Sequence, residues 1–144
     1  MRFNMYVPTR SIFGCGRLSE LHEQKLPGQK AMVVISNGKS IKENGSLERT
    51  IKELTSAGVD YVVFDQVQAN PLKSTVMAGA KTARDNGSDF IVALGGGSVM
   101  DASKAMAVMA TSDGDVWDYI SGGTGKCKAI VNTPLPVICI TTTA

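Results

Sequence analysis

The stretch most able to do chemistry is a run of three glycines, Gly95, Gly96 and Gly97, followed by Ser98. An apolar segment, FIVAL at 90–94, precedes the glycines, and a helix-forming segment follows them. Glycine has no Cβ, so it lets the backbone turn tightly and approach a ligand closely. A helix start presents unpaired N–H groups and the positive end of the helix dipole. The arrangement predicts a phosphate or pyrophosphate site, with Ser98 as the helix N-cap and a hydroxyl donor.

This glycine run matches neither of the two common nucleotide-binding patterns. Met100 stands where G-x-G-x-x-G has its third glycine, and the Gly-Lys-Thr/Ser of a P-loop is absent. A tight strand-to-helix turn that binds nothing therefore stays open as an alternative. Asp101 follows Ser98 by three residues and gives a capping-box-like S-x-x-D pattern. That carboxylate either holds the turn together or positions a cofactor.

A second polar segment, made of Asn37, Gly38, Lys39 and Ser40, follows the first apolar run of the chain. Dinucleotide sites often place an acid at the end of a strand to accept the hydroxyls of the adenosine ribose. Here no acid occurs before Glu43. A carboxylate would repel a 2′-phosphate, whereas Lys39 and the hydroxyls could bind one. A solvated turn is the alternative interpretation of this segment.

Short apolar runs alternate with amphipathic segments of helix length along the chain. Four runs are nearly continuous, as expected of strands covered on both faces: residues 31–36, 61–64, 90–94 and 136–140. Three helices are expected between them, over residues 46–57, 72–86 and 98–111. This alternation implies right-handed crossovers and an α/β fold with a doubly wound, mostly parallel, Rossmann-like sheet. Ligands of such sheets bind beyond the carboxyl ends of the strands, which favours a functional role for the glycine run.

Two further segments have a predicted place relative to this sheet. Asn70, which precedes Pro71, stands where the second strand gives way to a helix, so it faces the same sheet edge as the glycine run. An Asn before Pro is also commonly a plain turn former. Near the start of the chain, FNMYVP at 3–8 and SIFG at 11–14 could form a small edge hairpin.

The composition restricts the class of function. The 144 residues fit one compact domain, and a net charge of +2 with no block of consecutive Lys or Arg gives no reason to expect nucleic acid as a partner. No apolar run approaches the roughly 20 residues of a membrane span, and the first residues lack a signal-peptide core. The three cysteines, Cys15, Cys127 and Cys139, are odd in number and form no C-x-x-C, so neither a disulfide scaffold nor a thiolate metal site is expected. We therefore expect a reduced, cytoplasmic protein. His22 is the only histidine, so we expect neither one of the usual metal sites nor a Ser-His-Asp triad from this chain alone.

Together these segments resemble the N-terminal domain of iron-containing (group III) alcohol dehydrogenases. The resemblance rests on VPTRSIFGCG, SNGKSIKENG, ANP and DFIVALGGGSVMDASKA, in that order, and it is strongest to the butanol dehydrogenase and aldehyde reductase branch. Members of this family have an α/β nucleotide domain followed by a helical domain, which holds Fe²⁺ or Zn²⁺ through one Asp and three His. By this resemblance, Asn70 of the ANP segment would lie near the cofactor.

The resemblance implies that residues 1–144 are the dinucleotide-binding domain, truncated before the helical metal-binding domain. The cofactor would be NADP or NAD, with Gly96–Ser98 against its pyrophosphate. Asn37 occupies the position where NAD-preferring members carry Asp. Two threonines, Thr142 and Thr143, begin the T-T-A-G-T-G-S-E loop of the family.

The implied activity is that of an NAD(P)-dependent alcohol dehydrogenase, which passes a hydride between the nicotinamide and a metal-bound alcohol or aldehyde. None of the family's metal ligands is present, so we expect Fe²⁺ or Zn²⁺ only in an intact parent and no dehydrogenase activity from this chain alone. The expected partner is a small alcohol or aldehyde, and a homodimer is a possible assembly. Two alternatives stay open: a stand-alone module for a nucleotide or phosphorylated ligand, and part of an enzyme like glycerol dehydrogenase or dehydroquinate synthase.

Overall fold

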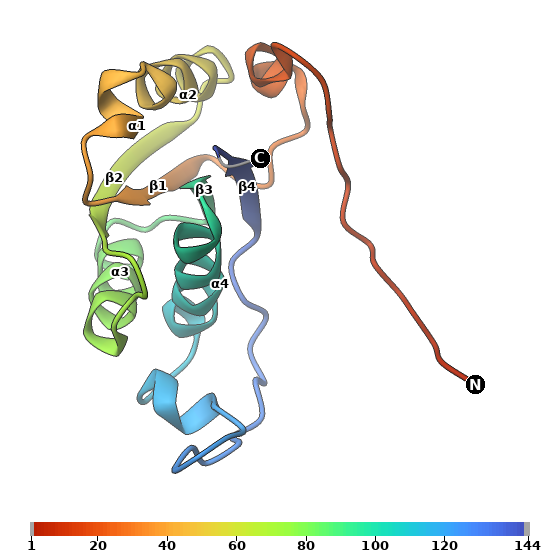
Figure 1. Cartoon of the computed structure of the whole chain (residues 1–144), viewed down its shortest axis with the longest axis vertical. Coiled ribbons are helices and arrows are strands. Elements are labelled where there is room, and N and C mark those ends of the chain that lie inside the picture. The colour runs from red at the N-terminus through yellow and green to blue at the C-terminus, as the bar shows by residue number, and fades with distance from the viewer. Residues whose placement is uncertain (1, 143–144) are drawn as a thin grey trace.

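A computed structural model describes residues 2–142 and shows a parallel sheet between two layers of helices (Figure 1). The sheet has the strand order β2-β1-β3-β4, and every pairing is parallel. This confirms the predicted α/β, Rossmann-like fold. The strands are β1 (Lys30–Ser36), β2 (Asp60–Val67), β3 (Phe90–Gly95) and β4 (Val137–Thr141). The helices are η1 (Arg17–Glu23), α1 (Ser40–Glu43), α2 (Ser46–Ser56), α3 (Lys73–Asp85), α4 (Gly97–Thr111) and η2 (Val116–Tyr119).

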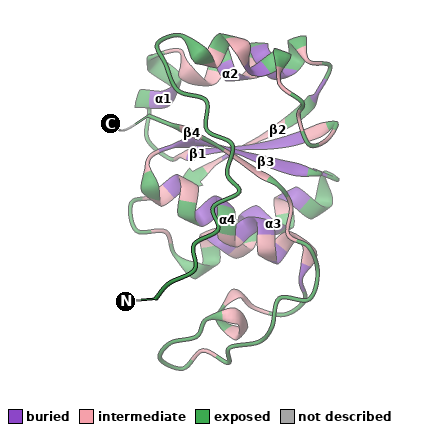
Figure 2. Ribbon diagram, turned by 90° about the vertical axis from the view of Figure 1, so that its right-hand side faces the viewer, coloured by how far each residue is buried: buried purple, intermediate pink, exposed green. Residues whose placement is uncertain are grey.

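The chain winds in both directions from β1, and this separates the helices into two layers. It leaves β1 towards β2 and then crosses to the opposite side of β1 to form β3 and β4. Right-handed crossovers in opposite directions place their helices on opposite faces of the sheet. As Figures 1 and 2 show, η1, α1 and α2 cover one face, and α3 and α4 cover the other. The alternating side chains of β1 divide accordingly, with Met32 and Val34 in the core under α3 and α4, and Val33 and Ile35 in the core under α2.

Only two of the four strands have the central environment that their apolar runs predict. All six residues of β3 are buried, as are five of the seven in β1. By contrast, β2 and β4 form the two edges of the described sheet and are partly exposed. A continuous apolar run reports burial on the two faces, but it carries no information about whether a neighbour pairs with both edges of the strand.

The predicted N-terminal hairpin is wrong, because residues 2–13 form no strand. Phe3, Met5 and Val7 are 78%, 78% and 62% exposed. The segment leaves η1 and extends away from the sheet and both helical layers (Figure 1). An isolated two-stranded hairpin is marginal in water, since it has too little apolar surface to bury by itself.

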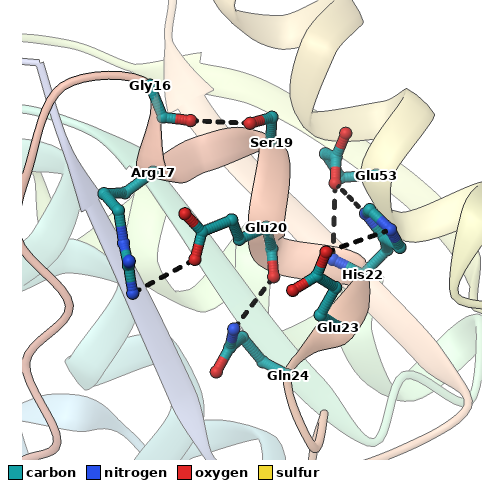
Figure 3. Close-up of polar contacts among 8 residues, drawn as sticks. All are labelled: Gly16, Arg17, Ser19, Glu20, His22, Glu23, Gln24 and Glu53. Carbon is teal, nitrogen blue, oxygen red and sulfur yellow. Dashed lines mark hydrogen bonds and ion pairs between the residues drawn. The ribbon is translucent and has the colours of Figure 1, made fainter.

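The single histidine joins the N-terminal region to the helical layer. The backbone N–H of His22, in η1, donates to Glu53 Oε2 on α2 over 3.4 Å, and the His22 ring Nδ1 lies 2.6 Å from the same oxygen (Figure 3). Leu21 beside it is buried against α2 and β1. The hydrogen bond to Glu53 raises the pKa of His22, and the nearby Glu23 carboxylate adds to the rise. The same bond lowers the pKa of Glu53.

These shifts predict that the His22–Glu53 pair stabilises the fold most strongly between pH 4.5 and 6.5, the ordinary pKa values of the two groups. Above that window, the contribution of His22 is lost as the pH rises through its raised, folded-state pKa. Below it, the contribution of Glu53 is lost as the pH falls through its lowered pKa. NMR titration of the only imidazole should give a pKa above 6.5, and His22→Gln should remove part of the fall in unfolding free energy between pH 6 and 9. A pKa at or below 6.5 contradicts the pairing.

Candidate functional site

The candidate site is built on the turn between β3 and α4. Gly95 ends β3, Gly96 is extended, with φ −84° and ψ −170°, and Gly97 begins α4. A Cβ on Gly95 would lie 2.7 Å from Val99 Cγ2, so this glycine allows the close packing of α4 against the end of β3. A Cβ on Gly97 would meet nothing within 4 Å. The first of these glycines therefore serves the fold, whereas a side chain at the last would meet open space.

The beginning of α4 differs from the predicted cap in one respect that favours a ligand. The helix begins at Gly97 with Gly96 as its N-cap, so Ser98 is not the N-cap, and no side chain caps the helix. The predicted capping box is also wrong, because the Asp101 side chain is 78% exposed and pairs with Lys104. Since Ser98 lies inside the first turn, its hydroxyl cannot reach the N–H groups that an N-cap residue serves. The first N–H groups of α4 are left to bind something else.

A hollow of about 330 Å³ opens beside this turn. It is lined by Gly96–Val99 from the start of α4, by Val67–Ala69 from the end of β2, and by Ser36 from the end of β1. These segments lie at the carboxyl ends of parallel strands, where the chain winds away from β1 in two directions. Ligands of open α/β sheets bind at such switch points. No acidic residue lies in the first turn of α4, so its positive end is not neutralised locally.

The predicted Asn37–Ser40 segment leaves β1 at the rim of this hollow. The backbone N–H of Asn37 donates to the carbonyl oxygen of Val67 over 2.9 Å, which ties the segment to the end of β2. Residues Asn37, Gly38, Lys39 and Ser40 are exposed, and Ser40 already forms the first residue of the short helix α1. None of these four residues lines the hollow, and the segment adjoins it only through Ser36, which precedes Asn37.

The remaining predicted site residues lie at the same sheet edge, with one exception. Asn70 follows Ala69 of the hollow and has a positive φ of 53°, a conformation that Asn tolerates better than most residues. The N–H of Thr142 donates to the carbonyl oxygen of Gly95 over 3.3 Å. Thr143 lies outside the described residues.

The sequence interpretation missed the residues that β2 contributes. Val67–Ala69 line the hollow, although they carry no charge and match no motif. Their only signal in the sequence is a position at the end of a predicted strand, immediately before Asn70 and Pro71.

Residues 8–144 match the model of a protein family described as iron-containing alcohol dehydrogenase. The chain belongs to this family. The predicted resemblance is thereby confirmed, and the glycine turn between β3 and α4 stands in the part of the chain that the family covers. Within the described residues, no helix is both long and apolar enough to cross a membrane.

Relatives of this chain include butanol dehydrogenases and an aldehyde reductase, as the sequence predicts. A probable NADH-dependent butanol dehydrogenase of Bacillus subtilis is 38% identical over 83% of this chain and 31% of its own length. The NADPH-dependent aldehyde reductase of Escherichia coli is 32% identical over 97% of this chain and 35% of its own length. The structure of an NADH-dependent butanol dehydrogenase from Thermotoga maritima superposes with a TM-score of 0.87 and 30% identity, covering 98% of this chain and 34% of the other. The chain thus spans about a third of the length of these relatives.

A metal ion, which the family name implies, does not fit the described side chains. Among residues 2–142, no three His, Cys, Asp or Glu side chains are placed so that they could hold one. No catalytic step through a metal follows from these residues. What the arrangement can do is hold an anionic ligand between a helix start and two strand ends.

Proposed function

We propose that this chain is the cofactor-binding part of an NAD(P)-dependent alcohol dehydrogenase that interconverts small alcohols and aldehydes. The observation that carries the proposal is the uncapped start of α4, which faces a hollow at the switch point of the sheet. Membership of the family supports it. The proposal includes a cytoplasmic location and a homodimer, for which the exposed Phe3, Met5 and Val7 offer an apolar surface.

In this proposal the residues of the chain bind and orient the dinucleotide. The backbone N–H groups of Gly97 and Ser98 and the helix dipole would bind the pyrophosphate, with the Ser98 hydroxyl as an additional donor. Asn37 and Lys39 would lie against the adenosine ribose, and Asn70 and Thr142 would border the remainder of the cofactor. When bound, the nicotinamide supplies the hydride chemistry. The same site fits NADP and NAD in all respects except the 2′ position of that ribose.

We predict that the chain binds NADP⁺ more tightly than NAD⁺. Asn37 brings no negative charge to the rim of the hollow, and the Lys39 side chain is exposed two residues further on. A charge-assisted contact to a 2′-phosphate contributes about 1.5–3 kcal/mol, which corresponds to roughly ten- to a hundredfold in affinity. Isothermal titration calorimetry with both cofactors measures the ratio directly and also tests whether the chain binds a dinucleotide at all.

Two substitutions separate the causes of this preference. Asn37→Asp should reduce the NADP⁺ preference by repulsion, and Lys39→Ala should reduce it by removing an attraction. Tighter binding of NAD⁺ by the unsubstituted chain defeats the prediction. A preference that survives both substitutions discards the Asn37–Ser40 segment as its cause.

A further inference from the structure

The segment that leaves β1 is attached to β2 at a second point. Besides the bond between the Asn37 N–H and Val67, the Lys42 ammonium on α1 lies 2.7 Å from Asp65 Oδ2 on β2. Asp65 stands two residues before Val67, which lines the hollow. The turn formed by residues 37–42 is thus held to β2 at both of its ends, once through the backbone and once through an ion pair.

The ion pair determines how much positive charge this turn presents to a ligand. The turn and α1 carry Lys39, Lys42 and Glu43, and within the described residues only Lys42 of these forms an ion pair. The Asp65 carboxylate is charged at neutral pH, and the hydrogen bond from the Lys42 ammonium lowers its pKa further. Asp65 therefore neutralises one of the two ammonium groups beside the proposed ribose site.

The pair is also easy to open. The side chains of Lys42 and Asp65 are 48% and 46% exposed. Ion pairs with this exposure contribute at most about 1 kcal/mol, because water and salt screen them. Removal of the carboxylate should therefore free the lysine without unfolding the sheet edge.

We propose that Asp65 is a specificity-determining residue of the dinucleotide site, which holds Lys42 on β2 and thereby keeps a second ammonium away from a 2′-phosphate. The inference rests on the proposed function. The turn itself carries no acid before Glu43. The inference assigns a role to the carboxylate that the neighbouring strand β2 supplies to this turn. Asp65 contacts Lys42 and acts through it, so its effect is one of charge placement.

The expected effect is limited by distance and by screening. Asp65 and Val67 are two residues apart on β2, which corresponds to about 7 Å along the strand. This separation is close to the Debye length of about 8 Å at physiological salt, so salt weakens the effect of the Asp65 charge at the hollow without abolishing it. A freed lysine side chain can close part of that distance, because it is long and flexible. We expect a change of about three- to fivefold in affinity, because removal of the carboxylate releases at most the roughly 1 kcal/mol that the ion pair contributes.

The test compares ADP-ribose with its 2′-phosphorylated form by calorimetry on the full chain. Asp65→Asn should bind the 2′-phosphorylated ligand about three- to fivefold more tightly, with less than a twofold change for ADP-ribose, and 0.5 M NaCl should remove most of the gain. Asp65→Glu is the matched control, because it keeps the carboxylate, and should behave like the unsubstituted chain. In the double variant Asp65→Asn/Lys42→Met the gain should disappear.

The outcomes distinguish the inference from the function on which it rests. An equal change for both ligands, or a gain that persists without Lys42, assigns the effect to general electrostatics and overturns the inference alone. An unchanged affinity in Asp65→Asn, with an unchanged melting temperature, also overturns it. Failure of the unsubstituted chain to bind either ligand overturns the proposed function and the inference together.

Discussion

Gly97→Val is expected to lower the affinity of the chain for NADP⁺ or ADP-ribose by about a hundredfold or more while the fold stays intact. In the free protein a Cβ at Gly97 meets nothing within 4 Å, so the fold has room for a side chain at this position. The added side chain would instead occupy the space in front of the uncapped N–H groups of α4, beside the hollow. Blocking close approach of the pyrophosphate to these donors should cost about 2.7 kcal/mol, which corresponds to a hundredfold.

The experiment has a matched control within the chain. Gly122 is also exposed, and a Cβ there meets nothing within 4 Å, but it lies in the turn between η2 and β4 and lines no part of the hollow. Calorimetric titration of Gly97→Val and Gly122→Val, with thermal melts of both, separates loss of the site from loss of the fold. Equal affinity of the two variants, both folded, would remove the β3–α4 turn from consideration as the phosphate site.

Gly95→Ala should destabilise the fold by about 1–3 kcal/mol, whereas Gly97→Val should leave the fold intact. Its Cβ would lie 2.7 Å from Val99 Cγ2 and 2.9 Å from Val99 Cβ, and Val99 is only 3% exposed. Because β3 is buried throughout, α4 would have to move away from the sheet to make room. Urea denaturation should show a lower midpoint for Gly95→Ala than for the unsubstituted chain and for Gly97→Ala.

A double-mutant cycle tests this cause. Val99→Ala removes both Cγ atoms, so Gly95→Ala should cost less in the Val99→Ala background than in the native one. Gly95→Ala and Val99→Ala should each destabilise the chain by themselves, so only the difference between the two backgrounds reports the contact between these residues. Additive losses, or a Gly95→Ala chain as stable as the native one, would show that the close packing of α4 on β3 does not depend on this glycine.

The sequence by itself determined the four strands, the three longest helices and the place of the glycine turn. The four strands and the helices α2, α3 and α4 lie within a few residues of their predicted bounds. Their signals are local, because a period of 3.6 residues or a continuous apolar run can be read within one segment. The Gly95–Gly97 run likewise marks the turn after β3 without reference to any other part of the chain. The alternation of strands and helices then limited the topology to a parallel, doubly wound sheet.

Only the tertiary structure decided which residues meet. It placed β2 and β4 at the edges of the described sheet, left residues 2–13 without a strand, and turned Asp101 away from the start of α4. It also brought Val67–Ala69 to the hollow and joined Lys42 to Asp65 across 23 positions of the chain. The physical reason is the same in each case: edge pairing, burial of a turn and ion pairing depend on groups from segments distant in sequence. No pattern within a single segment carries that information.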